Sequence, residues 1–150
     1  MSSTPSSKLR ILLADDDTDD SFLFNEALEQ SEIPVDFTHA EDGNALIEML
    51  HTTNKPDLLF LDVNMPYKNG IECLQEIRAK EEFQDMPIII YSTTNYKMNI
   101  DACYEKGADL YVVKPSTFED IMKMIRKVCS RDWFRKKKPS PEGFILSDFE

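Results

Sequence analysis

Residues 58–66 have the sequence LLFLDVNMP, in which four consecutive apolar side chains are followed directly by an aspartate. A strand with one exposed face alternates apolar and polar residues, whereas continuous apolarity is typical of a strand covered on both faces. The same pattern recurs at residues 11–13, 88–91 and 110–113. Residues 35–39 alternate instead, which predicts a strand with one exposed face or an edge position. The sequence therefore predicts five strands.

Between these runs, apolar residues recur at helical spacing. The clearest helix lies near the carboxyl end, where the apolar positions are Phe118, Ile121, Met122, Ile125, Val128 and Cys129. Strands and helices alternate five times, an order that predicts right-handed crossovers and a parallel sheet between helix layers. We therefore expect an α/β fold, a doubly wound five-stranded parallel sheet with helices on both faces.

Length and charge restrict the class of protein. A chain of 150 residues with 41% hydrophobic side chains suits one domain. We expect that domain at residues 9–130, after a flexible N-terminus at 1–8 and before a C-terminal extension at 131–150 without an output domain. The formal net charge of -11 argues against direct nucleic-acid binding. Because no apolar segment is long enough for a signal peptide or membrane span, we expect a cytoplasmic protein without a membrane partner.

The ends of the predicted strands carry the residues with reactive or metal-binding side chains. They are Asp15 and Asp16 after the first strand, Asp62 after the third, Ser92 after the fourth and Lys114 after the fifth. The ligand site of an open α/β sheet lies beyond the carboxyl ends of its strands, so we expect these side chains to meet. Clustered carboxylates suit Mg²⁺, and a lysine and a hydroxyl suit phosphoryl oxygens. A carboxylate can also accept a phosphoryl group covalently.

Each of these residues also has an ordinary structural explanation. A run of aspartates such as residues 15–17 caps helices, an aspartate such as Asp62 begins turns, and a lysine such as Lys114 is often solvated. Separate explanations do not account for the common position of these residues at one edge of the sheet. We therefore favour a shared phosphoryl and metal site.

Four segments together resemble a known family: LLADDD at 12–17, LLFLDVNMPYKNGIE at 58–72, PIIIYSTTN at 87–95 and GADLYVVKP at 107–115. In this order they resemble the receiver domain of two-component response regulators, over about residues 9–129. The resemblance implies a stand-alone receiver with a flavodoxin-like fold and strand order 2-1-3-4-5. It implies a phosphoacceptor at Asp62, an acidic pair at Asp15 and Asp16, a switch hydroxyl at Ser92, an invariant lysine at Lys114, a switch aromatic at Tyr111 and a metal-binding backbone carbonyl at Asn64.

The resemblance also implies a mechanism. A sensor histidine kinase or a histidine phosphotransfer protein donates a phosphoryl group to Asp62 in a Mg²⁺-dependent reaction. The metal is held by Asp16 and Asp62 directly and by Asp15 through water. Ser92 and Tyr111 then move toward the phosphoryl group, and a changed surface on the fourth helix, fifth strand and fifth helix binds a downstream protein target. Such a protein is a phosphoacceptor, not an enzyme, and at most catalyses its own phosphorylation and dephosphorylation.

The principal alternative is a haloacid-dehalogenase-type phosphatase with Asp15 as nucleophile and Asp17 as general acid. That family needs a further acidic pair at a later strand end, and the rest of the sequence offers only Glu119 and Asp120 within a helical pattern. A pseudo-receiver that binds partners without phosphorylation is a third hypothesis. Phosphate on Asp62 or on Asp15 distinguishes the first two.

Two further expectations concern the end of the chain and one peptide bond. The last part of the extension, after Pro141, carries four apolar residues in a polar context: Phe144, Ile145, Leu146 and Phe149. We expect them to dock on a partner or on a second copy, so that a homodimer forms through this tail or through the face from the fourth to the fifth helix. The resemblance also implies a cis peptide bond between Lys114 and Pro115.

Overall fold

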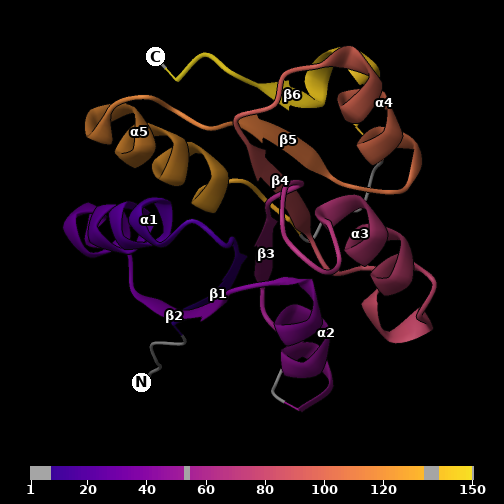
Figure 1. Cartoon of the computed structure of the whole chain (residues 1–150). Coiled ribbons are helices and arrows are strands. Elements are labelled where there is room, and N and C mark those ends of the chain that lie inside the picture. Colours follow the sequence, from indigo (N-terminus) through magenta and orange to yellow (C-terminus); the bar gives the residue numbers. More distant parts are fainter. Residues whose placement is uncertain (1–7, 53–54, 134–138, 150) are drawn as a thin grey trace.

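The computed structural model describes residues 8–52, 55–133 and 139–149. A six-stranded parallel sheet forms its centre, in the order β2-β1-β3-β4-β5-β6 (Figure 1). The strands are β1 (Leu9–Ala14), β2 (Val35–Ala40), β3 (Leu58–Leu61), β4 (Ile88–Ser92), β5 (Leu110–Val113) and β6 (Ile145–Leu146). The predicted order of the first five strands is confirmed. The predicted count of five is wrong, because β6 pairs with β5 and is too short to show a periodic pattern.

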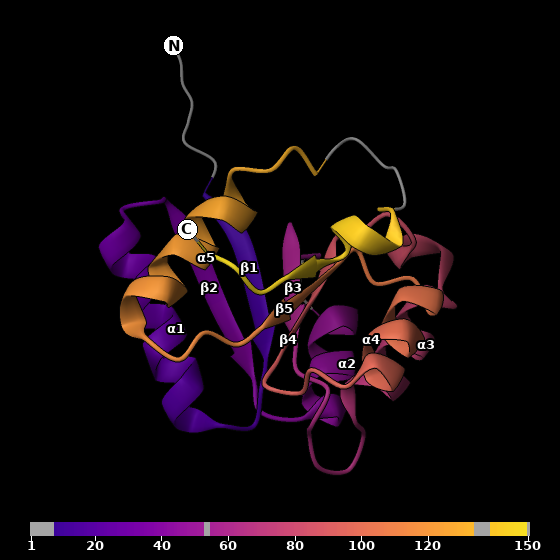
Figure 2. The same cartoon turned by 90° about the horizontal axis from the view of Figure 1, so that it is seen from above.

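Helices cover both faces of the sheet. On one face lie α1 (Thr18–Ser31) and α5 (Phe118–Cys129), and on the other lie α2 (Gly43–Thr52), α3 (Gly70–Arg78) and α4 (Lys97–Glu105) (Figure 2). Two short 3-10 helices are η1 (Glu81–Phe83) and η2 (Pro141–Gly143). This arrangement confirms the doubly wound α/β fold. Among the residues with described coordinates, no helix combines the length and apolarity needed to cross a bilayer.

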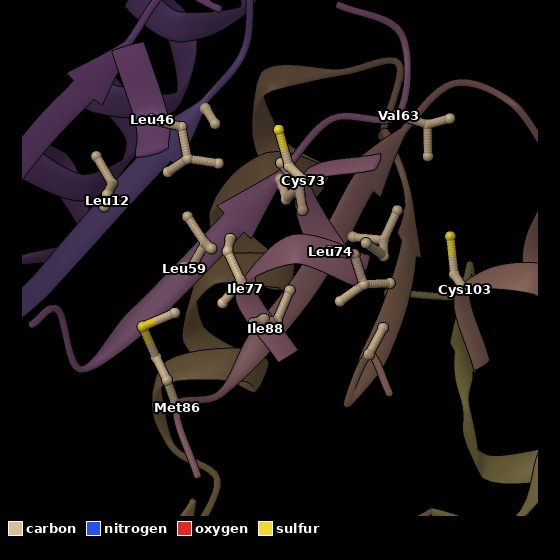
Figure 3. Packing of buried hydrophobic residues seen from close by; sticks show 14 of the residues in the cluster. Leu12, Leu46, Leu59, Val63, Cys73, Leu74, Ile77, Met86, Ile88 and Cys103 are labelled. Atoms are coloured by element: carbon tan, nitrogen blue, oxygen red, sulfur yellow. The ribbon is translucent and has the colours of Figure 1, made fainter. Parts of the chain in front are cut away.

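The continuous apolarity of the inner strands is explained by the two helix layers. In β3, Leu58 and Phe60 belong to the core beneath α1 and α5, whereas Leu59 and Leu61 belong to the core beneath α2, α3 and α4. Figure 3 shows the second of these cores, with Leu59 and Ile77 among its members. The edge strand β2 instead alternates half-buried and exposed residues over most of its length, as its sequence predicts.

Arg78 holds together the end of the sheet opposite to the carboxyl ends of the strands. Its guanidinium donates to the backbone oxygens of Gly107 at 2.9 Å, Phe83 at 2.7 Å and Met86 at 2.7 Å, and to Asp109 Oδ2 at 2.8 Å. The side chains of Arg78 and Asp109 are only 13% and 19% exposed. One cation therefore satisfies several carbonyls that the loops around η1 and before β5 would otherwise leave without donors.

The apolar residues of the C-terminal extension differ from expectation. The predicted flexible N-terminus lies, apart from Lys8, outside the described residues, and so do residues 134–138 of the extension. Phe144 and Phe149 are 1% and 8% exposed and pack within the chain itself, so they do not form the unpaired apolar patch that we expected. Ile145 is 43% exposed. The predicted docking on another molecule is thus wrong for the two aromatic residues, because the chain covers them.

Candidate functional site

The carboxyl ends of four neighbouring strands meet at one edge of the sheet, as predicted. The register pairs Ala14 with Leu61, which brings Asp15 and Asp62 side by side at the ends of β1 and β3. Ser92 is the last residue of β4, and the residue after β5 is Lys114, whose amide donates to Ser92 O at 2.9 Å. Asp15, Asp62 and Ser92 are all buried. The predicted residues therefore lie together at one edge of the sheet, where Lys114 contacts both Asp15 and Asp62.

Three carboxylates form a potential metal site. Asp15, Asp16 and Asp62 each place one oxygen within 4.8 Å of the others. Asp15 Oδ2 is fully buried, and Lys114 Nζ lies 2.8 Å from it in an ion pair. Burial raises the pKa of Asp15 to about 6, even though Lys114 lowers it. Three carboxylates with oxygens this close together form a hard-oxygen donor set that fits a divalent cation such as Mg²⁺.

Lys114 lies among carboxylates and is nearly enclosed. Its Nζ donates to Asp20 Oδ2 at 2.8 Å and to Asp62 Oδ2 at 3.2 Å, in addition to the ion pair with Asp15. Burial disfavours the ammonium, but the carboxylates around it raise the pKa of Lys114 above its ordinary value. The ammonium also lies 5.5 Å from the centre of the Tyr91 ring. Lys114 therefore stays charged and is positioned next to the oxygen atoms of Asp62.

Asp20 is a site residue that our sequence analysis missed. The sequence shows it only as part of an acidic first helical turn, where charge on the helix end is an adequate explanation. The helix cap supplies the missing information: Asp17 Oδ1 accepts from the amides of Asp19 and Asp20, at 3.0 and 3.1 Å. This cap directs the first turn of α1 over the site, so that the Asp20 carboxylate reaches Lys114.

His39 supports the loop that carries the acidic pair. Its Nε2 lies 2.7 Å from Asp15 O and 2.9 Å from Ser21 Oγ. Because a carbonyl oxygen can only accept, Nε2 carries the proton in this arrangement. Within the loop, Asp17 N donates to Asp15 Oδ1 at 2.9 Å. The loop between β1 and α1 is therefore held from β2 as well as from α1.

Asn64 and Gly70 shape the loop after Asp62. The amide of Asn64 donates to Asp62 Oδ1 at 3.2 Å, and its side-chain Nδ2 donates to Thr94 Oγ1 at 3.1 Å. A Cβ atom at Gly70 would lie 2.1 Å from the backbone oxygen of Asp62, so only glycine allows α3 to begin this close to Asp62. Asn64 thus lies beside Asp62, and its role as a carbonyl ligand of a metal stays a prediction.

Ser92 and Tyr111 are connected through Thr94. The amide of Thr94 donates to Ser92 Oγ at 3.2 Å, and the hydroxyl of Tyr111 donates to Thr94 O at 2.6 Å. Tyr111 is fully buried, and burial raises its pKa to about 12. One loop therefore links the Ser92 hydroxyl at the end of β4 to an aromatic side chain of β5. The peptide bond between Lys114 and Pro115 is trans, contrary to what the resemblance implied.

Comparisons with known proteins agree with this geometry. The family model described as response regulator receiver domain matches residues 11–126. Response regulator Rcp1 of Synechocystis sp. is 30% identical over 124 residues, which cover 79% of this chain and 84% of that protein. Transcriptional regulatory protein CpxR of Escherichia coli is 32% identical over 135 residues, which cover 89% of this chain but 55% of that protein. This chain thus spans most of Rcp1 but about half of CpxR.

Solved structures with the same fold include two response regulators. The Mn(2+)-bound form of Rcp1 superposes with a TM-score of 0.73 at 28% identity, covering 87% of this chain and 99% of that one. The phosphorylated cyanobacterial phytochrome response regulator RcpA superposes with a TM-score of 0.78 at 26% identity, covering 89% of this chain and all of that one. None of these comparisons points to the haloacid-dehalogenase-type phosphatase.

Proposed function

The chain belongs to the family of response regulator receiver domains, and we propose that it accepts a phosphoryl group on Asp62 in a Mg²⁺-dependent reaction. The observation that carries this proposal is the position of the buried Asp62 carboxylate, between the acidic pair of the loop after β1 and the ammonium of Lys114. A nucleophilic carboxylate at the end of β3 and a fixed cation at the end of β5, on the same edge of the sheet, are the parts that phosphoryl transfer needs.

The proposed transfer exchanges one bond for another at phosphorus. A carboxylate oxygen of Asp62 bonds to the phosphorus of a phosphohistidine while the bond from phosphorus to the imidazole nitrogen breaks, and the leaving imidazole nitrogen takes up a proton. We propose that Asp16, Asp62 and the carbonyl of Asn64 would hold Mg²⁺ directly and Asp15 through water, and the bound metal would offset charge on the phosphoryl oxygens. Lys114 stays charged and donates to a phosphoryl oxygen, as it now donates to Asp62.

The proposed response begins at Ser92. The phosphoryl group carries a charge of about -1.5 to -2 and three acceptor oxygens, so it draws the Ser92 hydroxyl away from the Thr94 amide, which now donates to it. Thr94 O in turn accepts from the hydroxyl of Tyr111, which transmits the displacement to β5. The surface formed by α4, β5 and α5 then differs between the two states, and a downstream protein target binds one of them.

Two solved structures of similar proteins support the proposed cofactor and the proposed modification. One solved structure is the Mn(2+)-bound form of Rcp1, and another is the phosphorylated form of RcpA. For this chain we propose Mg²⁺ as the metal, and a sensor histidine kinase or a histidine phosphotransfer protein as the donor. We also propose a cytoplasmic location and no direct contact with nucleic acid, in line with the net charge of -11.

A homodimer through the α4–β5–α5 face stays a prediction, which sedimentation with and without phosphodonor tests. A homodimer through the C-terminal extension requires Phe144 and Phe149 to leave their positions within the chain. We do not propose the phosphatase, because Asp17, its general acid, is engaged as the cap of α1 and no comparison supports it.

Incubation with a small-molecule phosphodonor and Mg²⁺ tests the function. We expect an acid-stable, base-labile phosphoryl group on Asp62 in peptide mass spectra, lost with a chelator and in the variant Asp62→Asn. The variant Asp36→Asn, in the exposed part of β2, is the matched control and keeps the adduct. No adduct on Asp62 despite bound Mg²⁺ contradicts the proposal, and an adduct on Asp15 supports the phosphatase instead.

A further inference from the structure

Residues 139–149, which we name the C-terminal strap, cross the open edge of the sheet at β5. Within the strap, β6 pairs in parallel with β5, and its register sets Ile145 opposite Tyr111 and Leu146 opposite Val112. The amide of Tyr111 donates to Phe144 O at 2.8 Å. An edge strand offers unpaired amide and carbonyl groups, and the strap satisfies them as an added strand would.

Two aromatic side chains of the strap lie in separate cores. Phe144 joins the core beneath α2, α3 and α4, with its ring centre 5.1 Å from that of Tyr104 and 6.3 Å from that of Tyr111. Phe149 joins the core beneath α1 and α5. The strap therefore crosses β5 from one face of the sheet to the other, and both ends of the crossing are buried apolar contacts.

Polar contacts lie next to both aromatic anchors. The hydroxyl of Tyr104 donates to Pro139 O at 2.6 Å, and Lys127 Nζ of α5 donates to Asp148 O at 3.3 Å. Tyr104 belongs to α4, Tyr111 to β5 and Lys127 to α5. The strap thus occupies the same three elements that the proposed function uses as its output surface (Figure 1).

We propose that the edge of β5 is a peptide-binding site filled by the chain's own C-terminal strap, and that phosphorylation of Asp62 releases the strap through Tyr111. The coupling rests on the proposed function, whereas the binding site rests on the observed contacts. The site takes an extended peptide that pairs in parallel with β5 and carries two aromatic side chains five positions apart, as Phe144 and Phe149 are.

Tyr111 connects the phosphorylation site to the strap because it contacts both Thr94 and Phe144. Its hydroxyl is held by Thr94 O, next to Ser92, while its ring packs against Phe144 and its amide is bonded to Phe144 O. When Ser92 and Thr94 move toward a phosphoryl group, the hydroxyl follows and the ring withdraws from Phe144. The strap then loses part of its apolar contact and exchanges more readily with a competing peptide. By linkage, a docked strap opposes phosphorylation by the same factor.

Amide hydrogen exchange of the full chain, followed by mass spectrometry, tests the docking. In the variant Phe144→Ala we expect exchange in the segments 110–113 and 144–149 to be at least about tenfold faster than in the wild type. Ile145→Ala truncates an exposed neighbour and is expected to leave both rates unchanged. Phe149→Ala removes the second anchor independently, and circular dichroism checks that each variant is folded. Unchanged exchange in both Phe144→Ala and Phe149→Ala overturns the proposed binding site.

The same measurement with phosphodonor and Mg²⁺ tests the coupling. In the wild type phosphorylated at Asp62 we expect exchange in these segments to rise about tenfold, within the usual range of coupling between two sites. In Tyr111→Phe, which keeps the ring and loses the hydroxyl, phosphorylation is expected to leave exchange unchanged. A phosphorylated wild type with unchanged exchange overturns the coupling and leaves the proposed function intact. Failure to phosphorylate Asp62 overturns the function and the coupling, while Phe144→Ala still decides the docking.

A peptide added in trans provides the remaining test. A fluorescein-labelled peptide of residues 139–149 is expected to bind Phe144→Ala, whose own strap is weakly held, and to show at least about tenfold weaker binding to the unphosphorylated wild type. The same peptide with alanine at both aromatic positions is the control and is expected not to bind. Equal binding of the two peptides overturns the aromatic specificity of the site.

Discussion

The contact between Lys114 and Asp20 leads to a prediction that distinguishes the effect of this one ion pair on stability from the effect of the total negative charge of the first turn of α1. Asp20→Asn keeps the size of the side chain and removes the charge 2.8 Å from Lys114 Nζ. At this distance two unit charges attract by about 6 kcal/mol at an effective dielectric constant of about 20. Asp20 is 34% exposed, so solvent screens much of this attraction, and Lys114 keeps Asp15 and Asp62 as partners.

From these terms we expect Asp20→Asn to lower the free energy of unfolding by about 1–2 kcal/mol, close to the net value of one hydrogen bond to a charged group. The variant should also bind Mg²⁺ about tenfold more weakly, equivalent to about 1.4 kcal/mol, because Lys114 shifts toward the oxygens of Asp15 and Asp62 that the metal needs. Urea unfolding without metal and calorimetric titration with Mg²⁺ measure the two effects.

Asp19→Asn is the matched control for this experiment. It removes the same formal charge from the same helical turn, but Asp19 is exposed and makes no contact with Lys114 among the described residues. We expect its free energy of unfolding to change by less than about 0.5 kcal/mol. Equal losses in the two variants would show that only total charge matters. A gain of stability in Asp20→Asn would show that repulsion among the carboxylates outweighs the ion pair, and would refute the reasoning.

Three further predictions concern pH, packing and the approach of α3. Burial raises the pKa of Asp15 from 3.8 to about 6, so the native state binds the proton more tightly than the unfolded state does. The stability from this group is therefore present below about pH 4 and lost as the pH rises through about 6. Urea unfolding at a series of pH values should show that the unfolding free energy of Asp15→Asn depends less on pH between about 4 and 6 than that of the wild type; an identical pH dependence contradicts this assignment. Arg78→Met leaves four backbone carbonyls and a carboxylate without their shared donor and should cost about 3–5 kcal/mol of unfolding free energy; a loss below about 1 kcal/mol would show that water replaces the guanidinium. Gly70→Ala should displace Asp62 and slow phosphorylation at least about tenfold, whereas Gly143→Ala, whose added Cβ meets a side-chain oxygen at 3.3 Å, should not; equal rates contradict the assigned role of the close approach.

The sequence predicted most of the fold because the signal for each inner strand is local. Leu58 and Phe60 face one helix layer and Leu59 and Leu61 face the other, and this double coverage requires the unbroken apolar run that the sequence displays. Asp62 follows this run directly, so its place at the carboxyl edge follows from the end of the strand. The order of the first five strands came from the family resemblance and is confirmed.

The residues that the sequence did not predict depend on contacts between distant segments. Asp20 reaches Lys114 across 94 positions of the chain, and only the cap of α1 and the end of β5 together bring the two side chains within 2.8 Å. Likewise β6 has two residues, and it exists because the open edge of β5 offers hydrogen-bonding groups to the passing chain. Neither feature leaves a periodic pattern in its own segment.

The sequence alone determined the layered α/β architecture and the set of reactive side chains. Both signals are local, because an unbroken apolar run indicates a strand buried on two faces and the residue after that run lies at the strand end. Tertiary structure decided which carboxylates share Lys114 and where Phe144 and Phe149 are buried. The physical reason is that an ion pair or an apolar contact depends on distance in space, and the folded sheet brings together groups that no local pattern connects.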